Sequence, residues 1–496
     1  MTNLADLIPA GGGQNNTDFV ADGTIASGKP VVLTAAGKAS EVGYTARSDS
    51  LGSETALNGA YSVQGDSVMA HDTVNNKLLY VFGDMENSQH GYARVVTISG
   101  STVTVGTKAL FFNAAGYQGG SVVCIGSNKF FIAYTADVGG YLYGRVASVS
   151  GTTVTFGTQL VIASAATNLS KQGLAYSPTT DAIVLLANYS SANFLWRFTV
   201  SGTTITDDTA ATTSLTSVLN DGGCSSLSCQ IVRNTTTDEF FVAWKKDGGT
   251  TAYGGVIEMA AGGGGSAFTG GSAVLFTSDL KDMGGLTWDS TNDRYVVVYQ
   301  HDNDYQYYSV ASTSSGVTTW GATTAFVSVT GSAAFLSFDQ SVSKVVTTVS
   351  SDSSPYARKY TTGVVSGTST TWATPATLTA GVSSNFFTLY DSALGKTLLL
   401  YVRSSVSYLV IFEVGGNVTS LTSTNLLGLA AGAISDTATG TINTWGSRNE
   451  VQTSLTIGSD YYVQADGTLS TTSTSPAQLI GTAITATQIN IKDYTG

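Results

Sequence analysis

The sequence is short of charged side chains. Only 11% of its 496 residues are Asp, Glu, Lys or Arg, against roughly 25% in an average globular protein. The charges it has are unbalanced, with 34 acidic and 22 basic residues and a net charge of −12. Binding to nucleic-acid phosphates needs clustered lysines and arginines, and the sequence holds no such cluster. We therefore expect no nucleic-acid partner.

Side chains that support metal, redox or nucleophilic chemistry are also scarce. Three cysteines cannot form a disulfide framework, and an odd count suggests buried thiols made in a reducing cell. Cys224 and Cys229 are close enough to share a metal ion, but no histidine or further cysteine accompanies them. The three histidines, His71, His90 and His301, are scattered along the chain, which leaves little material for a triad or a zinc site. The sequence predicts no catalytic residue, no metal site and no cofactor.

Long hydrophobic runs are missing as well. The longest, such as "TLLLYV" and "YLVIF", are far shorter than the ~20 residues that span a bilayer. The opening "MTNLADLIPA" lacks the positive start and apolar stretch of a signal peptide. We expect no membrane insertion, and synthesis in the cytoplasm.

What the chain does have is glycine (56 residues), many Thr, Val and Tyr, and very little proline (6 residues). This composition is typical of an all-β protein with a hydroxyl-rich surface. At 42% hydrophobic residues it can bury a large core.

Seven repeats organise the middle of the chain. Each consists of a polar turn followed by an apolar strand, as in "HDTVNNKLLYVF" and "WDSTNDRYVVVY", and the strands open at intervals of 50 to 57 residues, at Lys77, Lys129, Ala182, Glu239, Arg294, Lys344 and Lys396. Most repeats carry a second marker, a Ser-Gly hairpin turn such as "SGSTVTVG" or "SGTTVTFG". In the second repeat we expect four strands, at 119–126, 129–135, 141–149 and 152–161. Seven such units predict a seven-bladed β-propeller; the rival is a β-solenoid, whose rungs are usually shorter.

The loops divide between two faces of a propeller. Turns between the first and second strands, and between the third and fourth, are short and uniform, whereas the other connections are long and varied, as in "GDMENSQHG" and "QHDNDYQYY". Variable loops on a rigid scaffold often bind ligands. Six aromatic residues at or just after these loops are candidates for stacking on a sugar, the alternative being that they pack within or between blades: Tyr141, Tyr143, Trp196, Tyr305, Tyr307 and Tyr308.

Ring closure has two candidate strands. The stretch "SDSLGSETAL" before the first blade resembles the fourth strands of the repeats, and would complete the last blade. The seventh repeat also carries a fourth strand of its own, "NVTSLTST". Sequence alone leaves this choice open.

Two flanks remain outside the repeats. Residues 1–43 and 425–496 consist of short strands joined by glycine turns, and each is too small to bury a core alone. We expect them to form one β-rich barrel- or sandwich-like module, split by a propeller at 44–424.

The flanks resemble the small β-rich modules of tailed-phage capsid decoration proteins. The matching stretches are "GTIASGKPVVLTAAGKASEV", "LLGLAAGAI", "TIGSDYYVQADGTLST" and "QLIGTAITATQINI", and the opening "LADLIPAGGGQNN" with the repeats is similar to marine phage virion proteins. The resemblance implies a non-enzymatic structural protein of the virion, decorating the capsid or forming a head fibre. Such a protein contacts other virion proteins, assembles as a homo-oligomer (a trimer by analogy), and uses its propeller to bind a host surface or glycan. The alternatives are a tail fibre or tail spike that binds a receptor, and a polysaccharide depolymerase.

Overall fold

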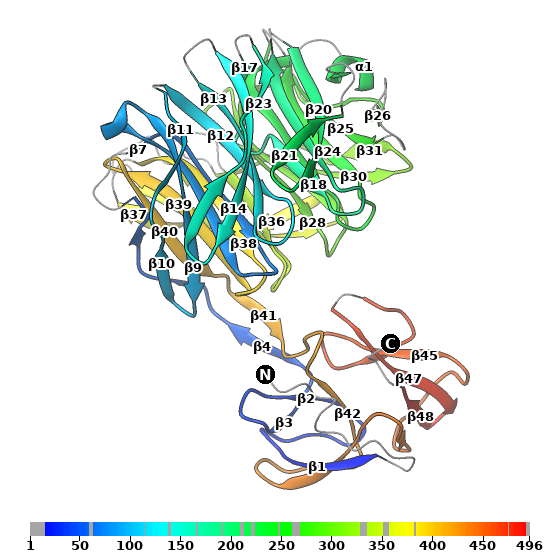
Figure 1. Cartoon of the computed structure of the whole chain (residues 1–496). Coiled ribbons are helices and arrows are strands. Elements are labelled where there is room, and N and C mark those ends of the chain that lie inside the picture. The colour runs from blue at the N-terminus through cyan, green and yellow to red at the C-terminus, as the bar shows by residue number, and fades with distance from the viewer. Residues whose placement is uncertain are drawn as a thin grey trace. The chain divides into compact units, whose positions relative to one another are not determined.

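The chain folds as two compact units built almost entirely of β-strands. In this computed structural model the described residues are 15–58, 63–114, 116–136, 140–164, 167–189, 192–208, 213–219, 224–246, 249–259, 268–327, 335–350, 357–380, 383–474 and 476–492. One unit is Asp49–Val414, and the segments on either side of it form the other (Figure 1). The helical elements in these ranges are two single turns, η2 (Met85–Asn87) and α1 (Leu215–Leu219). Neither is long and apolar enough to cross a membrane.

The larger unit is a closed ring of antiparallel sheets. Seven sheets follow one another along the described chain, and we call them blades 1 to 7 and their strands A to D. Strand A of each blade packs against strand A of the next, and that of blade 7 packs against that of blade 1. This closed arrangement confirms the seven-bladed propeller and excludes the solenoid.

The blades share one strand plan. Strands A, B and C form a meander, and the fourth strand pairs with C in two pieces, so that most blades read A, B, C, D, D. Blades 1 to 3 comprise β7 (Val63–Asp72), β8 (Lys77–Asp84), β9 (His90–Ser99), β10 (Thr102–Val105) and β11 (Ala109–Phe112); β12 (Tyr117–Cys124), β13 (Lys129–Ala136), β14 (Tyr141–Ser150), β15 (Thr153–Phe156) and β16 (Leu160–Ala163); and β17 (Thr167–Asn168), β18 (Leu174–Ser177), β19 (Ala182–Tyr189), β20 (Ala192–Ser201), β21 (Thr204–Asp207) and β22 (Thr213–Ser214).

The remaining blades follow the same plan. Blades 4 to 6 comprise β23 (Cys224–Arg233), β24 (Phe240–Lys246), β25 (Ala252–Met259), β26 (Phe268–Gly270) and β27 (Val274–Thr277); β28 (Leu280–Asp289), β29 (Arg294–His301), β30 (Gln306–Ser314), β31 (Val317–Trp320) and β32 (Thr324–Val327); and β33 (Phe335–Asp339), β34 (Lys344–Ser350), β35 (Ala357–Ser366), β36 (Ser369–Trp372) and β37 (Ala376–Ala380). Blade 7 comprises β38 (Ser383–Asp391), β39 (Lys396–Arg403) and β40 (Val406–Glu413), with β5 (Ser50–Leu51) and β6 (Thr55–Ala56) from the start of the chain. Six of the seven B strands begin at the residue that the repeat predicts; the fourth begins at Phe240, one residue later.

The continuous D strand expected at 152–161 is wrong in one respect, because the strand breaks at Gly157. A Cβ atom on this glycine would lie 2.5 Å from the carbonyl oxygen of Thr203, in the C–D turn of the next blade. A Cβ atom on Gly321 of blade 5 would likewise lie 2.1 Å from the carbonyl oxygen of Thr368 in blade 6. Glycine therefore recurs here because the neighbouring blade leaves no room for a side chain.

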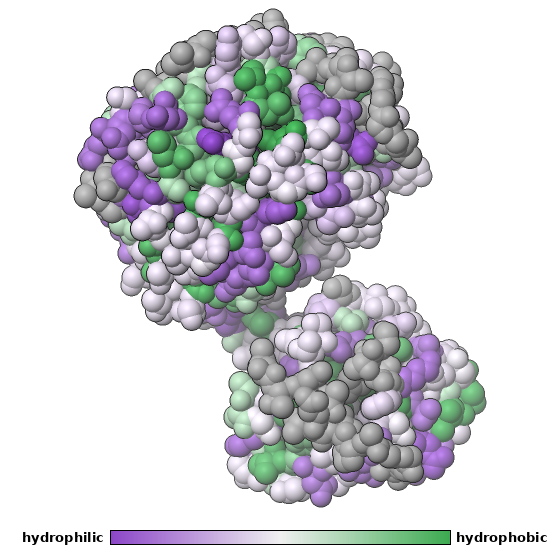
Figure 2. Space-filling model, in the orientation of Figure 1, coloured by the Kyte–Doolittle hydropathy of each residue, from purple (hydrophilic) through white to green (hydrophobic). Residues whose placement is uncertain are grey.

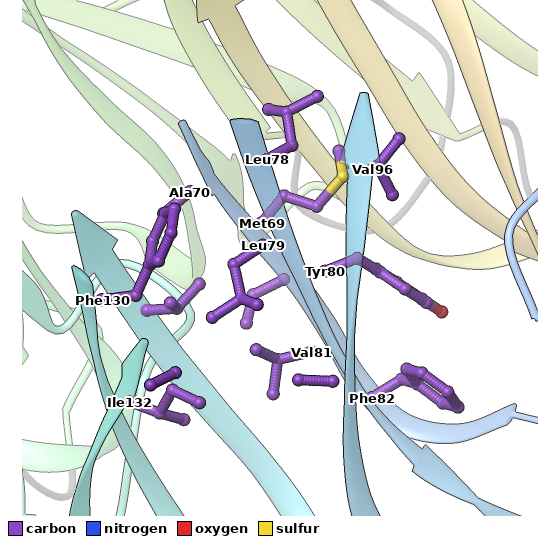
Figure 3. Packing of buried hydrophobic residues seen from close by; sticks show 14 of the residues in the cluster. Met69, Ala70, Leu78, Leu79, Tyr80, Val81, Phe82, Val96, Phe130 and Ile132 are labelled. Atoms are coloured by element: carbon purple, nitrogen blue, oxygen red, sulfur yellow. The ribbon is translucent and has the colours of Figure 1, made fainter. Parts of the chain in front are cut away.

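Strand B is apolar at nearly every position because both faces of each blade are covered. On β8, Leu79 and Val81 point toward Phe130 and Ile132 of blade 2 (Figure 3). Tyr80 points the other way, and its hydroxyl donates to Ser407 Oγ of blade 7 at 2.6 Å. Its burial raises the pKa of the Tyr80 phenol to about 12, so the group stays neutral. Burying one large apolar side chain such as Leu79 contributes about 1.5–3 kcal/mol to stability. Similar interfaces between neighbouring blades recur around the ring.

The A–B turns explain the polar half of the repeat. A buried Asp, Asn or Ser lies at the end of strand A, or directly after it, in six blades, and its side chain accepts hydrogen bonds from the backbone of the turn. In blade 5, Asp289 Oδ1 accepts from Thr291 N at 2.9 Å and Asn292 N at 3.1 Å. A residue with positive φ precedes strand B in every blade, directly in six of them and two positions before the strand in blade 4: Asn76, Asn128, Asp181, Asp238, Asp293, Ser343 and Gly395. Short polar side chains and glycine tolerate this left-handed conformation best. The repeat is therefore a turn signature.

The first residues of the propeller close its ring. Strands β5 and β6 pair with the outer edge of β40, so the early stretch completes blade 7. Asn58 anchors this stretch: it is fully buried, its Oδ1 accepts from Ser407 N at 2.9 Å and its Nδ2 donates to Ser405 O at 3.2 Å. Arg94 Nη1 of blade 1 donates to Leu57 O at 2.9 Å. The alternative closing strand, β41 (Gly416–Thr419), pairs instead with β4 (Tyr44–Arg47).

The second unit joins the two flanks, as expected. One sheet has the order β1-β43-β42-β2-β3 and so mixes strands from both ends of the chain; the other, β44-β48-β47-β45-β46, is C-terminal. The bounds are β1 (Asn16–Val20), β2 (Pro30–Leu33), β3 (Ala39–Glu41), β42 (Leu426–Ala430), β43 (Thr439–Asn443), β44 (Arg448–Asn449), β45 (Asp460–Val463), β46 (Leu469–Ser470), β47 (Gln478–Thr485) and β48 (Gln488–Ile491). The limits of the propeller, at 49 and 414, lie inside the expected 44 and 424 because the ribbon β4–β41 belongs to the flanks.

We predict that Asn58→Ala destabilises the propeller by roughly 2–4 kcal/mol, because the buried N–H of Ser407 and the partly buried C=O of Ser405 lose their partner. Chemical unfolding followed by tryptophan fluorescence measures this. The control is Asn113→Ala, since Asn113 is exposed and the change should alter stability by less than about 0.5 kcal/mol. Equal stability of the two variants would contradict the role of Asn58 in closure.

We also predict that Gly321→Ala destabilises the propeller by about 1–3 kcal/mol, because the new methyl group meets Thr368 O of the next blade. Gly249→Ala is the matched control, since a methyl group at that position would have its nearest neighbouring atom 3.6 Å away. A melting temperature unchanged by Gly321→Ala would show that the blades separate without strain.

Candidate functional site

A cluster of surface aromatic and polar groups lies at the B–C loop of blade 5. Strand β29 ends at His301 and β30 begins at Gln306, and four residues connect them. His301 N donates to Tyr305 O at 3.0 Å, and Asp304 N donates to His301 O at 2.8 Å. Asp304 has a φ of 69°, a conformation that Asp and Asn adopt more readily than most residues. The sequence "HDNDYQ" thus encodes a tight, hydrogen-bonded loop.

An aromatic platform lies on this loop. The rings of His301 and Tyr307 stack with centroids 4.3 Å apart and planes 25° from parallel. Asn303 Nδ2 donates to the Tyr307 hydroxyl at 3.2 Å, which fixes the orientation of the phenol. Tyr299 lies against Tyr307, with ring centroids 6.0 Å apart, and burial raises the pKa of the Tyr299 phenol to about 12. Both platform rings are partly exposed.

Charged groups surround the platform. Asp304 Oδ1 accepts hydrogen bonds from Gln300 Nε2 at 3.0 Å and from Lys281 Nζ, at the start of strand A. Asp302 is exposed, and its backbone N–H donates to Asp279 O at 2.9 Å. The loop is thereby tied to the connection from blade 4. Hydrogen-bond donors and acceptors stand beside an aromatic face, a combination that suits a polyhydroxylated ligand.

The predicted aromatic residues do not form one site. Trp196 and Tyr308 are 1% and 5% exposed, so they take the packing role that was the alternative for them. Tyr308 joins two blades, since its hydroxyl donates to Thr370 O at 2.9 Å. Tyr143 is also buried and stacks on Tyr134, 5.4 Å away.

Accessible rings remain at three predicted positions. Tyr305 and Tyr307 lie together in blade 5, and Tyr141 lies at the start of β14 in blade 2. Residues 137–139, 190–191, 220–223 and 247–248, which belong to other variable loops, lie outside the described residues. Sequence reasoning missed His301 as a stacking partner and Lys281 as a loop anchor. The signal for His301 was its place at the end of strand B, two residues after Tyr299, which pairs with Tyr307 of strand C.

The two cysteines whose side chains the structure describes, Cys124 and Cys229, form no disulfide. Cys229 is fully buried, and burial raises the pKa of its thiol to about 12, so it stays protonated. The side chain of Cys224 lies outside what the structure describes. Among the described residues, no three His, Cys, Asp or Glu side chains form a group that would hold a metal ion.

Hydrophobic groups reach the surface only in patches. In the view of Figure 2, hydrophobic areas of the propeller are separated by hydrophilic ones. Large apolar side chains that are exposed in the described propeller come from separate elements: Val74, Met85, Leu110, Val161, Leu275, Val317 and Val364. A polar ligand therefore fits the blade 5 loop better than a broad apolar partner does.

The comparisons with known proteins found similar structures but no similar sequence. No family model and no curated protein matches the sequence. Among solved structures, AofleA from Arthrobotrys oligospora is similar with a TM-score of 0.41 and 10% identity, over 68% of this chain and 91% of that one. A triple arginine-to-alanine mutant of AofleA gives 0.43 and 11%, over the same shares. TolB from Acinetobacter baumannii gives 0.32 and 10%, over 72% of this chain and 66% of that one. All three scores are below 0.5.

We predict that Asp304→Ala loosens the blade 5 loop, because it removes the acceptor for Lys281 and Gln300 and places alanine at a positive φ. Hydrogen exchange by mass spectrometry should show the 301–305 amides exchanging about tenfold faster or more. Asp302→Ala, in the same loop but with an exposed side chain, should leave the rates nearly unchanged. Equal rates in both variants would mean that Asp304 does not hold the loop.

Proposed function

We propose that this protein is a non-enzymatic, glycan-binding surface protein in which the propeller presents the ligand site and the split β unit attaches it to a larger particle. The observation that carries the proposal is the stacked His301–Tyr307 platform beside fixed polar groups on a variable loop. The closed ring supports it, because a rigid scaffold holds the loop in place at little entropic cost on binding.

The chemistry of the loop suits a sugar. One face of a pyranose ring presents C–H groups, which pack against an aromatic ring. Its hydroxyl groups both donate and accept hydrogen bonds, and Asp302 and Asn303 offer exposed acceptors and donors next to Tyr307. Each contact is weak, so the affinity of one site for one sugar should be modest.

We further propose that the particle is a phage virion. The support is the resemblance of the flanks to capsid decoration modules, and the way in which strands from both ends of the chain build one sheet. Many copies on one particle would raise avidity without any new contact. A trimer is the expected assembly by analogy with decoration modules, and capsid, head-fibre and tail-fibre positions are all compatible with the fold.

The binding proposal predicts a loss with Tyr307→Ala. Purified protein should bind a bacterial surface polysaccharide on an array, and Tyr307→Ala should weaken binding about tenfold or more, because the stacking surface is removed. Tyr44→Ala is the control, since Tyr44 is 52% exposed but lies in the other unit. Binding that survives Tyr307→Ala unchanged would refute the blade 5 site.

Three further measurements separate the alternatives. Release of reducing ends from the bound polysaccharide would favour a depolymerase over a binding protein. Labelling with antibodies on purified phage particles tests the virion location, and sedimentation tests the trimer. Absence of the protein from the particles would contradict the virion proposal while leaving the glycan site intact.

A further inference from the structure

The imidazole ring of His301 in the blade 5 loop is held in one tautomer. Its Nδ1 atom accepts a hydrogen bond from the backbone N–H of Asn303 at 3.2 Å. A backbone N–H can only donate, so Nδ1 carries a lone pair and the proton of the neutral ring lies on Nε2. The loop therefore presents His301 Nε2 as a hydrogen-bond donor at the edge of the aromatic platform.

A carboxylate lies opposite this donor. Asp279, in the connection between blades 4 and 5, places its Oδ2 atom 3.8 Å from His301 Nε2. That separation is too long for a hydrogen bond between the two atoms, but it is shorter than two hydrogen bonds of about 2.8 Å laid end to end. One hydroxyl oxygen can therefore lie within hydrogen-bond distance of both atoms, accepting from Nε2 and donating to Oδ2.

Both groups are accessible, and both are held in place. The side chain of His301 is 21% exposed and that of Asp279 is 54% exposed. Asp279 Oδ2 accepts from Ser278 Oγ at 2.7 Å, and the backbone oxygen of Asp279 accepts from Asp302 N at 2.9 Å. These bonds tie the connection to the loop, so the space between Nε2 and Oδ2 exists before a ligand binds.

The charge beside the donor is negative. Asp302 follows His301 directly, and its side chain is exposed, as is that of Asp279. Within the described residues neither carboxylate forms an ion pair with a lysine or arginine, whereas Asp304 of the same loop is paired with Lys281. An anionic group that approaches His301 therefore meets two like charges.

A second lysine near the loop does not offset these carboxylates. Lys245 Nζ donates to the backbone oxygen of Lys281 at 2.7 Å, which directs its charge to the start of strand A.

We propose that the blade 5 site selects neutral glycans over carboxylated ones, and that His301 and Asp279 determine this specificity. One sugar hydroxyl lies between Nε2 and Oδ2, where a group that both accepts and donates satisfies the two atoms. A sugar carboxylate in the same place accepts from Nε2 but cannot donate to Oδ2, and it is repelled by Asp279 and Asp302. This selectivity rests on the glycan-binding role proposed above and adds the chemical class of the glycan.

The test compares neutral polysaccharides with their own carboxylated forms. The whole protein is applied to an array of neutral bacterial surface polysaccharides of glucose, mannose or galactose, each beside the same polymer with its primary hydroxyl groups oxidised to carboxylates. The neutral form should bind at least about tenfold more tightly. The difference should narrow in high salt, because salt screens exposed charges.

Two negative results have different meanings. Equal or tighter binding of the oxidised forms would overturn the selectivity and leave glycan binding in place. Binding to no polymer of the array, in either form, would overturn the proposed function and the selectivity together.

The decisive variant is Asp279→Asn, which keeps an acceptor oxygen and removes the charge. The neutral form should bind about threefold more weakly, because an amide oxygen is a weaker acceptor than a carboxylate. The oxidised form should bind about tenfold more tightly, because one like charge is gone. Glu86→Gln is the matched control, since Glu86 is exposed in the B–C loop of blade 1, and it should change neither. Equal weakening of both forms by Asp279→Asn would mean that Asp279 holds the loop and does not select the ligand.

His301→Phe tests the donor separately. Phenylalanine keeps a ring to stack on Tyr307 but has no N–H group, so the neutral form should bind about tenfold more weakly. Unchanged binding would overturn the role of His301. The comparison of neutral and oxidised forms needs only the wild-type protein, so it decides the selectivity even if a variant fails to fold.

Discussion

Closure of the ring is the constraint on which the rest of the structure depends. A propeller of antiparallel sheets leaves one unpaired edge wherever the chain begins and ends, and an unpaired edge is prone to aggregation. Here the residues before blade 1 pair with β40 of blade 7, and the buried amide of Asn58 fixes them there. The chain therefore enters and leaves the propeller at the same blade. Its two flanks emerge as neighbours, and the ribbon β4–β41 continues their pairing from Arg47 and Gly416 onward.

The split unit follows from that closure. Because β5 and β40 lie side by side, two flanks that are far apart in sequence start out close in space. Residues such as Val31 and Ile442 then bury their side chains in one shared core. Neither flank is long enough to do so alone.

The features that could be predicted from the sequence are those that depend on local chemistry, such as the A–B turns. The A–B turns repeat because each needs a side-chain acceptor at the end of strand A and a left-handed residue before strand B, and both needs are met by short polar residues such as Asp289 and Asp293. The break in strand D was not predictable, because it depends on how closely Gly157 approaches the next blade. The interruption of strand A in blade 3, at Lys171 and Gln172, was not predictable for the same reason. The hydrogen-bond partners of these two residues come from blades 2, 4 and 5.

The aromatic residues of the candidate site show the same division. The alternation of a strand predicts that Tyr307 and Tyr308 point to opposite faces, and they do differ, one accessible and one buried. The packing of blade 6 against blade 5 decides which of the two side chains is exposed to solvent. Tyr308 is the buried one, and its hydroxyl donates a hydrogen bond to Thr370 O of blade 6. The sequence identified the aromatic cluster, but it could not show that Tyr307 is the accessible ring and that Tyr308 is a contact between blades.

Departures from the repeat are the most informative positions of the ring. The turn residues recur from blade to blade because every blade needs them to fold, so they carry no information about ligands. The blade 5 loop carries stacked rings that are not needed to complete a blade. The segment between β17 and β18 of blade 3 differs as well, because its backbone and the Gln172 side chain form hydrogen bonds with blades 2, 4 and 5. In a seven-fold scaffold, function is best sought where one blade differs without a folding reason.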